Sequence, residues 1–221
     1  MLRDDSNGLR GEGAMRNQES FSAGRQSGPL FPGAAVAAAL LLAAPQAAAH
    51  VFSEAGAGWN AGFSHPFSGL DHVLAMLAVG LWAAQIGRPA LWPLPLAFPL
   101  TMALGGLLGA YGMPLPWVES GIATSVLVLG VMIGLALKPP LWACTGLVML
   151  FAVFHGHAHG TGLPGTASPA LYGLGFVIAT AILHAVGLGI GQLKRWAVLQ
   201  RLVRQGGWAI AATGVVLFLV L

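Results

Sequence analysis

Long apolar runs, separated by short stretches rich in glycine, proline or charge, dominate the chain from residue 67 to its end. A helix needs roughly 20 apolar residues to cross a bilayer core of about 30 Å, and the pattern predicts six such helices. Their expected bounds are 67–87, 92–111, 119–137, 141–159, 170–191 and 205–221. The uncharged run 139–193 holds two of them, because the stretch HGHAHGTGLPGTASP interrupts it. The sequence therefore predicts an all-α, polytopic membrane protein built as a six-transmembrane-helix bundle.

The beginning of the chain follows another pattern. Residues 1–29 are polar, and they precede the apolar run LFPGAAVAAALLLAA and three alanines at 47–49. This order is typical of a secretory signal peptide, so we expect a polar extension and cleaved signal at 1–49 and a transmembrane domain at 50–221. The alternative is an uncleaved additional helix. Translation could begin at Met1 or at Met15, and Met15 gives the more usual signal length.

Composition supports the membrane assignment, since 8% of residues are charged and 56% are hydrophobic, against about 25% charged residues in soluble domains. The formal net charge is +3, but the positions of the basic residues argue against nucleic acid as a partner. Those beyond the predicted signal all fall in loops after the first, third and fifth spans: Arg88, Lys138, Lys194, Arg195, Arg201 and Arg204. The positive-inside rule makes these loops cytoplasmic, which places the mature amino terminus on the outer side.

Polar groups that are costly in hydrocarbon gather at the opposite, outer ends of the predicted spans. They are His65, Asp71 and His72 at the first span, Glu119 at the third, and His155, His157 and His159 at the fourth. Pro66 suits a first helical turn, so we expect His65 just before the helix and Asp71 about 8 Å further along it. Imidazole with carboxylate suits nickel, cobalt, zinc or copper. The sequence thus predicts a metal site at the outer face, with a purely structural hydrogen-bond network as the alternative.

Further residues are weaker candidates for metal contact. Met76 follows His72 by one turn, on a stripe that also includes Gly69 and Gly80. His155 and His159 share one helix face, whereas His157 between them points elsewhere unless the helix unwinds. His50 becomes the amino terminus if cleavage follows residue 49, and its amine and imidazole could then chelate a metal.

One histidine stands apart from the outer group. His184 lies about 21 Å along the fifth span from its predicted start at residue 170, nearer the cytoplasmic side, with Thr180 one turn away on the same face. It is either a second station on a pathway or a structural histidine that bonds to a neighbouring helix. The single cysteine, Cys144, excludes an internal disulfide and any cysteine-based zinc cage.

Two motifs resemble those of a known family. HPFSGLDHVLAMLAVG at 65–80 matches HPxxGxDHxxxMxxxG at every specified position, and FHGHAHG at 154–160 resembles a second histidine motif. Together with ESGIATSVLVLG at 119–130, they make residues 50–221 resemble the HupE/UreJ family. The resemblance implies a nickel or cobalt permease of the bacterial inner membrane, with a periplasmic amino terminus, that supplies metal to hydrogenase or urease. It implies nickel contacts at His65, Asp71, His72, Glu119, His155 and His159.

One position departs from the family pattern. The second motif usually reads FHGxAHGxE, and here Gly162 takes the place of the glutamate. The metal is expected as a transported substrate and not as a prosthetic group of an enzyme, and the bilayer is its other partner. Assembly of several copies stays open.

Two other classes of function also stay open. The chain could be an intramembrane zinc hydrolase, using Ser68 together with Asp71, His72, His155 and His159 around a catalytic metal. It could also be an assembly or scaffold protein whose polar groups only join helices. No Walker motif is present, so any transport is expected to be secondary or channel-like.

Overall fold

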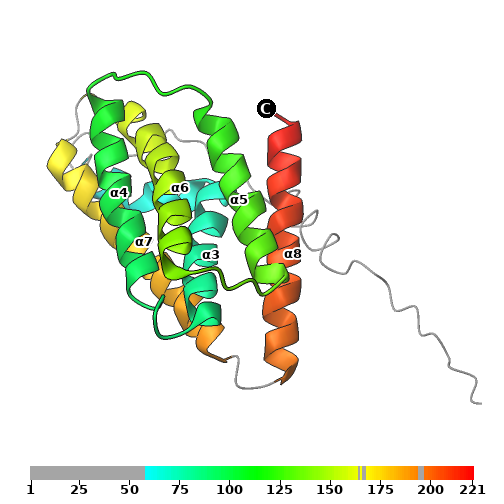
Figure 1. Cartoon of the computed structure of the whole chain (residues 1–221). Coiled ribbons are helices and arrows are strands. Elements are labelled where there is room, and N and C mark those ends of the chain that lie inside the picture. Colours follow the sequence, from blue (N-terminus) through cyan, green and yellow to red (C-terminus); the bar gives the residue numbers. More distant parts are fainter. Residues whose placement is uncertain (1–57, 164, 166–167, 194–196) are drawn as a thin grey trace, which may run out of the picture. The chain divides into compact units, whose positions relative to one another are not determined.

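The computed structural model describes residues 58–163, 165, 168–193 and 197–221, and within them every regular element is a helix (Figure 1). The helices are α2 (Trp59–Ser68), α3 (Leu70–Ile86), α4 (Pro93–Ala110), α5 (Val118–Gly134), α6 (Leu141–Thr161), α7 (Pro169–Gln192) and α8 (Ala197–Leu219). The all-α prediction is therefore confirmed for this part of the chain. The predicted signal, its cleavage site and His50 lie outside the described residues.

Several of these helices are suited to crossing a membrane. Four of them, α4, α6, α7 and α8, are long and apolar enough by length and composition. The pair α2 and α3 passes the same test jointly, but the two are bent by 85° at the break between them. Helix α5 is a shorter apolar helix of 17 residues. The structure thus supports a multi-pass membrane protein with four or five candidate spans, and the predicted six are not confirmed.

The start of the first predicted span is wrong. Pro66 lies inside α2, close to the end of that helix, and His65 is in its last turn. Gly69 has an extended backbone, with φ −112° and ψ 124°, and it separates α2 from α3. A Cβ at Gly69 would lie 2.5 Å from Asp71 Oδ1 and 3.1 Å from His72 Nδ1. The side chains of Asp71 and His72 therefore fold back over the break between the two helices.

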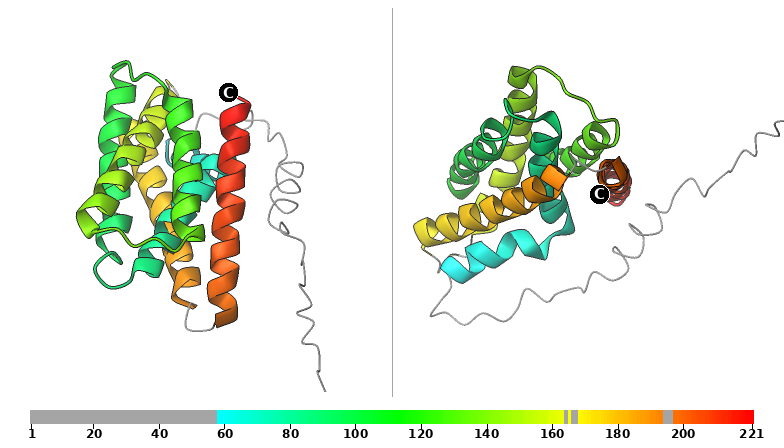
Figure 2. Two further views of the ribbon diagram at one scale, coloured as in Figure 1. Left: turned by 45° about the vertical axis from the view of Figure 1, so that its right-hand side comes forward. Right: turned by 90° about the horizontal axis from the view of Figure 1, so that it is seen from below.

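Backbone-to-backbone packing through glycine holds the helices together. Helix α4 packs on α6, α5 on α8, and α3 on α7. A Cβ at Gly105 of α4 would meet the backbone of Val153 on α6, and one at Gly187 of α7 would meet the backbone of Leu77 on α3. Helix α2 lies along α7 in the same way, which the right-hand view of Figure 2 displays. The short helix that carries His65 is thereby fixed against the bundle.

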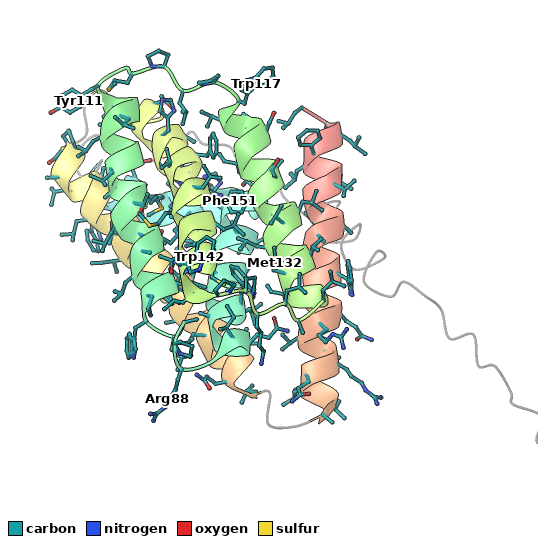
Figure 3. All side chains as sticks on the ribbon, viewed as in Figure 1. Arg88, Tyr111, Trp117, Met132, Trp142 and Phe151 are labelled. Atoms are coloured by element: carbon teal, nitrogen blue, oxygen red, sulfur yellow. The ribbon has the colours of Figure 1, made fainter. Side chains whose placement is uncertain are left out.

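The described basic residues follow or begin helices at one end of the bundle. Arg88 comes after α3 and Lys138 after α5, while Arg204, in the first half of α8, donates from Nε to the Gly134 carbonyl of α5 at 2.9 Å. Lys138 and Arg204 line one common pocket with Gln85 of α3. Figure 3 places Arg88 at the opposite end from Tyr111 and Trp117. The charge asymmetry predicted along the sequence therefore corresponds to one end of the described bundle.

Candidate metal site

Imidazole rings from three helices meet inside the bundle: His65 of α2, His72 of α3, and His155 and His159 of α6. We call these four residues the histidine cluster. The His159 ring centroid lies 4.5 Å from those of both His65 and His72, and the centroids of His72 and His155 are 4.8 Å apart. His155 and His159 are buried, while His65 and His72 are half-buried. Four of the residues predicted for the outer site are thus brought together.

Hydrogen bonds determine which nitrogen of His72 is free. Its Nδ1 lies 2.9 Å from Asp71 Oδ1, and the same oxygen accepts the His72 backbone N–H at 2.8 Å. An ionised carboxylate can only accept, so Nδ1 carries a proton, and in the neutral ring Nε2 keeps a lone pair. Nε2 is buried without a hydrogen-bond partner among the described residues. A carboxylate on the far nitrogen is how metal-ligating histidines are commonly oriented.

A serine determines in a similar way which nitrogen of His155 is free. The Ser125 hydroxyl donates its only proton to the Ile122 carbonyl at 2.6 Å. Its oxygen lies 2.9 Å from His155 Nε2 and must therefore accept from that nitrogen. The proton of His155 is consequently on Nε2, and Nδ1 is a buried lone pair with no partner in the described part of the chain. Both lone pairs, on His72 and His155, belong to rings in contact with one another.

The His159 ring packs against other rings. Its centroid lies 3.7 Å from that of Phe176, in addition to its contacts with His65 and His72. The side chain is 2% exposed, and neither ring nitrogen has a hydrogen-bond partner among the described residues. Buried polar atoms in native proteins are nearly always paired. An imidazole left without either partner, in contact with the rings of His65 and His72, indicates a place for a ligand.

The four imidazole rings of the histidine cluster are not arranged as a complete metal coordination sphere. No group of three or more His, Cys, Asp or Glu side chains within the described ranges is arranged to hold an ion. Imidazole nitrogens lie about 2.0–2.1 Å from a bound zinc ion. Other first-row transition metal ions likewise need the nitrogen lone pairs to point at one centre. The edge-to-face contacts seen here would therefore have to turn to point the nitrogens at one ion.

The remaining predicted residues lie in different surroundings. Glu119 is exposed in the first turn of α5, and no hydrogen bond or ion pair joins it to the histidine cluster within the described structure. His157 points away, as expected, with Nε2 2.7 Å from the Met113 carbonyl. A Cβ at Gly162 would lie 3.9 Å from His65 Cε1. The position that lacks the motif glutamate thus adjoins the histidine cluster.

The serine proposed for a hydrolase is not in the histidine cluster. Ser68 is exposed, and its hydroxyl donates to the His65 backbone carbonyl at 2.6 Å. Ser125, which does contact the cluster, was not predicted from the sequence. A serine in an apolar helix has helix packing as its ordinary explanation, and only the spatial pairing with His155 reveals the role of Ser125.

Comparison with known proteins agrees with the motifs. A family model described as HupE / UreJ protein matches residues 38–217. Protein HupE of Rhizobium leguminosarum bv. viciae is 44% identical over 160 residues, which are 72% of this chain and 84% of that protein. No solved structure matches the chain. The resemblance in the two histidine motifs extends over most of the sequence, and the chain belongs to the HupE/UreJ family.

Proposed function

We propose that this protein is a secondary permease that imports a divalent transition metal, nickel or cobalt, through the bacterial inner membrane. The observation that carries the proposal is the set of buried imidazole lone pairs without a partner in the described structure, on His72, His155 and His159. Family membership supports it, because HupE/UreJ proteins are associated with hydrogenase or urease maturation and with nickel or cobalt transport. Neutral nitrogen donors suit these borderline ions better than magnesium or calcium.

The histidine cluster captures the ion by replacing its water with nitrogen ligands. Asp71 acts as a positioning residue, since its Oδ1 holds the His72 ring through Nδ1, and its negative charge attracts a cation. Ser125 positions His155 in the same manner. His65, near the end of the short helix α2, adds a ring from the side of the break at Gly69. This assignment makes the three imidazoles of His65, His72 and His159 the contacts first met by the ion.

The proposed topology has six membrane crossings, one for each of the helices α3 to α8. The shortest, α3 and α5, have 17 residues each, which is at the lower limit of about 17 residues for a transmembrane helix. The basic end is then cytoplasmic by the positive-inside rule. The histidine cluster belongs to the periplasmic half.

Cysteine labelling tests this topology. In a Cys144→Ala background, Met113→Cys is expected to react with a membrane-impermeant maleimide in intact spheroplasts, because Met113 lies in the loop between α4 and α5. Lys138→Cys, in the next loop, is expected to react only after permeabilisation. Both native side chains are exposed, so accessibility within the protein is matched. Labelling of both positions from the same side would rule out an odd number of crossings between them.

Substitution of either positioning residue is expected to weaken nickel binding. Loss of a group that orients a metal ligand typically lowers affinity about 10–100-fold, and we expect that range for Asp71→Asn and for Ser125→Ala. Nickel titration of the purified protein measures the effect. Ser64→Ala is the matched control, because Ser64 is exposed and bonds only to carbonyls of its own helix among the described residues. Wild-type affinity in Ser125→Ala would remove His155 from the set of ligands.

Uptake of radioactive nickel tests the function itself. Cells that lack their own nickel transporters are compared with and without this chain, with cobalt, zinc and copper as competitors. We expect saturable uptake that cobalt inhibits most strongly. If no tested ion enters and the purified protein binds none, the assembly or scaffold function replaces the permease. We find no support for the zinc hydrolase, whose serine hydroxyl is directed to the His65 carbonyl.

A further inference from the structure

A second group of donor atoms lies in the bundle beyond the histidine cluster, where α3, α4 and α7 meet. It consists of His184 and Thr180 of α7, Met76 of α3 and Met102 of α4, and we call it the inner site. The side chains of Met76, Met102 and Thr180 are 0% exposed and that of His184 is 2% exposed. None of them makes an ion pair within the described residues.

The hydrogen bond of His184 leaves a nitrogen free. Its Nδ1 lies 2.7 Å from the Met76 backbone carbonyl. A carbonyl oxygen can only accept, so Nδ1 carries the proton and Nε2 is a bare lone pair. This buried nitrogen has no hydrogen-bond partner in the described structure. Histidines that bind metals commonly donate their far N–H to a carbonyl or a carboxylate, and His184 has this arrangement.

Two thioether sulfurs adjoin the same hydroxyl group. Thr180 Oγ1 donates to Met76 Sδ at 3.4 Å, and it lies 4.0 Å from Met102 Sδ. Thioethers are weak hydrogen-bond acceptors but good ligands for softer transition metals. The inner site thus combines one imidazole nitrogen, two sulfurs and one hydroxyl. All are buried, and three helices contribute them.

The Phe98 side chain contacts both the histidine cluster and the inner site. The Phe98 ring centroid lies 5.6 Å from that of His155 and 5.2 Å from that of His184. Phe98 is 0% exposed, and it precedes Met102 by one turn on α4. The two groups of donors are therefore neighbours, and the Phe98 ring lies against a histidine of each.

We propose that the inner site is a second metal-binding station, which takes the transported ion from the histidine cluster and holds it through His184 Nε2 and the sulfurs of Met76 and Met102. The inference rests on the proposed permease function. It adds a sulfur-containing environment that the histidine cluster does not provide. Transfer between the two stations requires the Phe98 ring to move aside.

Nickel K-edge X-ray absorption tests the inner site, because it distinguishes sulfur from nitrogen and oxygen neighbours. Purified wild-type protein saturated with nickel is expected to show a sulfur shell together with nitrogen. The double variant Met76→Leu/Met102→Leu, which conserves side-chain volume, is expected to lose the sulfur shell and keep the nitrogen shell. His72→Ala is expected to retain sulfur, since it alters only the histidine cluster.

Two controls exclude other sources of sulfur. Met149→Leu changes an exposed methionine of α6, and Cys144→Ala removes the thiol bonded to the Pro139 carbonyl; both are expected to keep the signal. Nitrogen neighbours without sulfur in the saturated wild type would overturn the inner site and leave the permease standing. Failure of the wild type to bind nickel would overturn both.

Discussion

Replacement of His72 by alanine is expected to abolish nickel uptake at matched membrane levels. The His72 ring contacts the rings of His155 and His159 at centroid distances of 4.8 and 4.5 Å, and that of His65 at 6.4 Å. Its removal takes away one lone pair and leaves Asp71 without the ring that it orients. Loss of a group that only orients a ligand lowers metal affinity about 10–100-fold. Because His72 is proposed as a ligand, we expect its removal to lower nickel affinity on the order of 100-fold or more. Initial uptake rates of radioactive nickel measure it.

His157→Gln is the matched control for this variant. His157 is a buried histidine whose Nε2 lies 2.7 Å from the Met113 carbonyl, and a glutamine amide can still donate to that oxygen. We expect near wild-type uptake. Equal losses in both variants would mean that any histidine substitution damages the protein, and normal uptake in His72→Ala would remove the histidine cluster from the pathway.

Substitution of Gly156 by alanine is expected to destabilise the whole bundle. An added Cβ there would overlap the Met102 carbonyl oxygen of α4 and lie 2.9 Å from the Gly106 nitrogen. Both are backbone atoms, so no side-chain rotation relieves the overlap, and α4 and α6 must separate. Overpacking of this kind costs about 1–3 kcal/mol and occasionally more. Thermal unfolding in detergent is expected to occur at a clearly lower temperature, with less monodisperse protein recovered.

Gly146→Ala is the control on the same helix. No heavy atom of another part of the described structure lies within 4 Å of a Cβ added at Gly146. Alanine is favoured over glycine in a helix by about 0.5–1 kcal/mol, so this variant is expected to be as stable as the wild type or slightly more so. If Gly156→Ala were equally stable, the close contact between α4 and α6 would not be a feature of the folded protein.

Hydrophobic patterning predicted where the long helices lie, because each needs a continuous apolar run. It did not predict the break at Gly69. Pro66 is favourable at the start of a helix, yet here α2 packs along α7 and carries Pro66 near its end. The glycine contacts that hold α2 in place lie between residues far apart in sequence, so no local pattern reveals the 85° bend.

The histidine cluster was partly predictable from the sequence. Helical spacing placed His155 and His159 on one face and turned His157 away, and the structure agrees with both expectations. Ser125 and Phe98 could not be inferred, because their meaning depends on which helices become neighbours. Glu119 was included for its residue type and its place at a helix start, but its side chain is exposed.

Nickel entry into proteoliposomes tests the central claim most directly, because no other cellular transporter is present. Purified protein is reconstituted into vesicles that contain a nickel-sensitive dye, and nickel is then added outside. The proposed function predicts a dye response that saturates with nickel concentration, is inhibited by cobalt and is lost in His72→Ala. A wild-type response no faster than that of protein-free vesicles, from correctly folded and inserted protein, would contradict it.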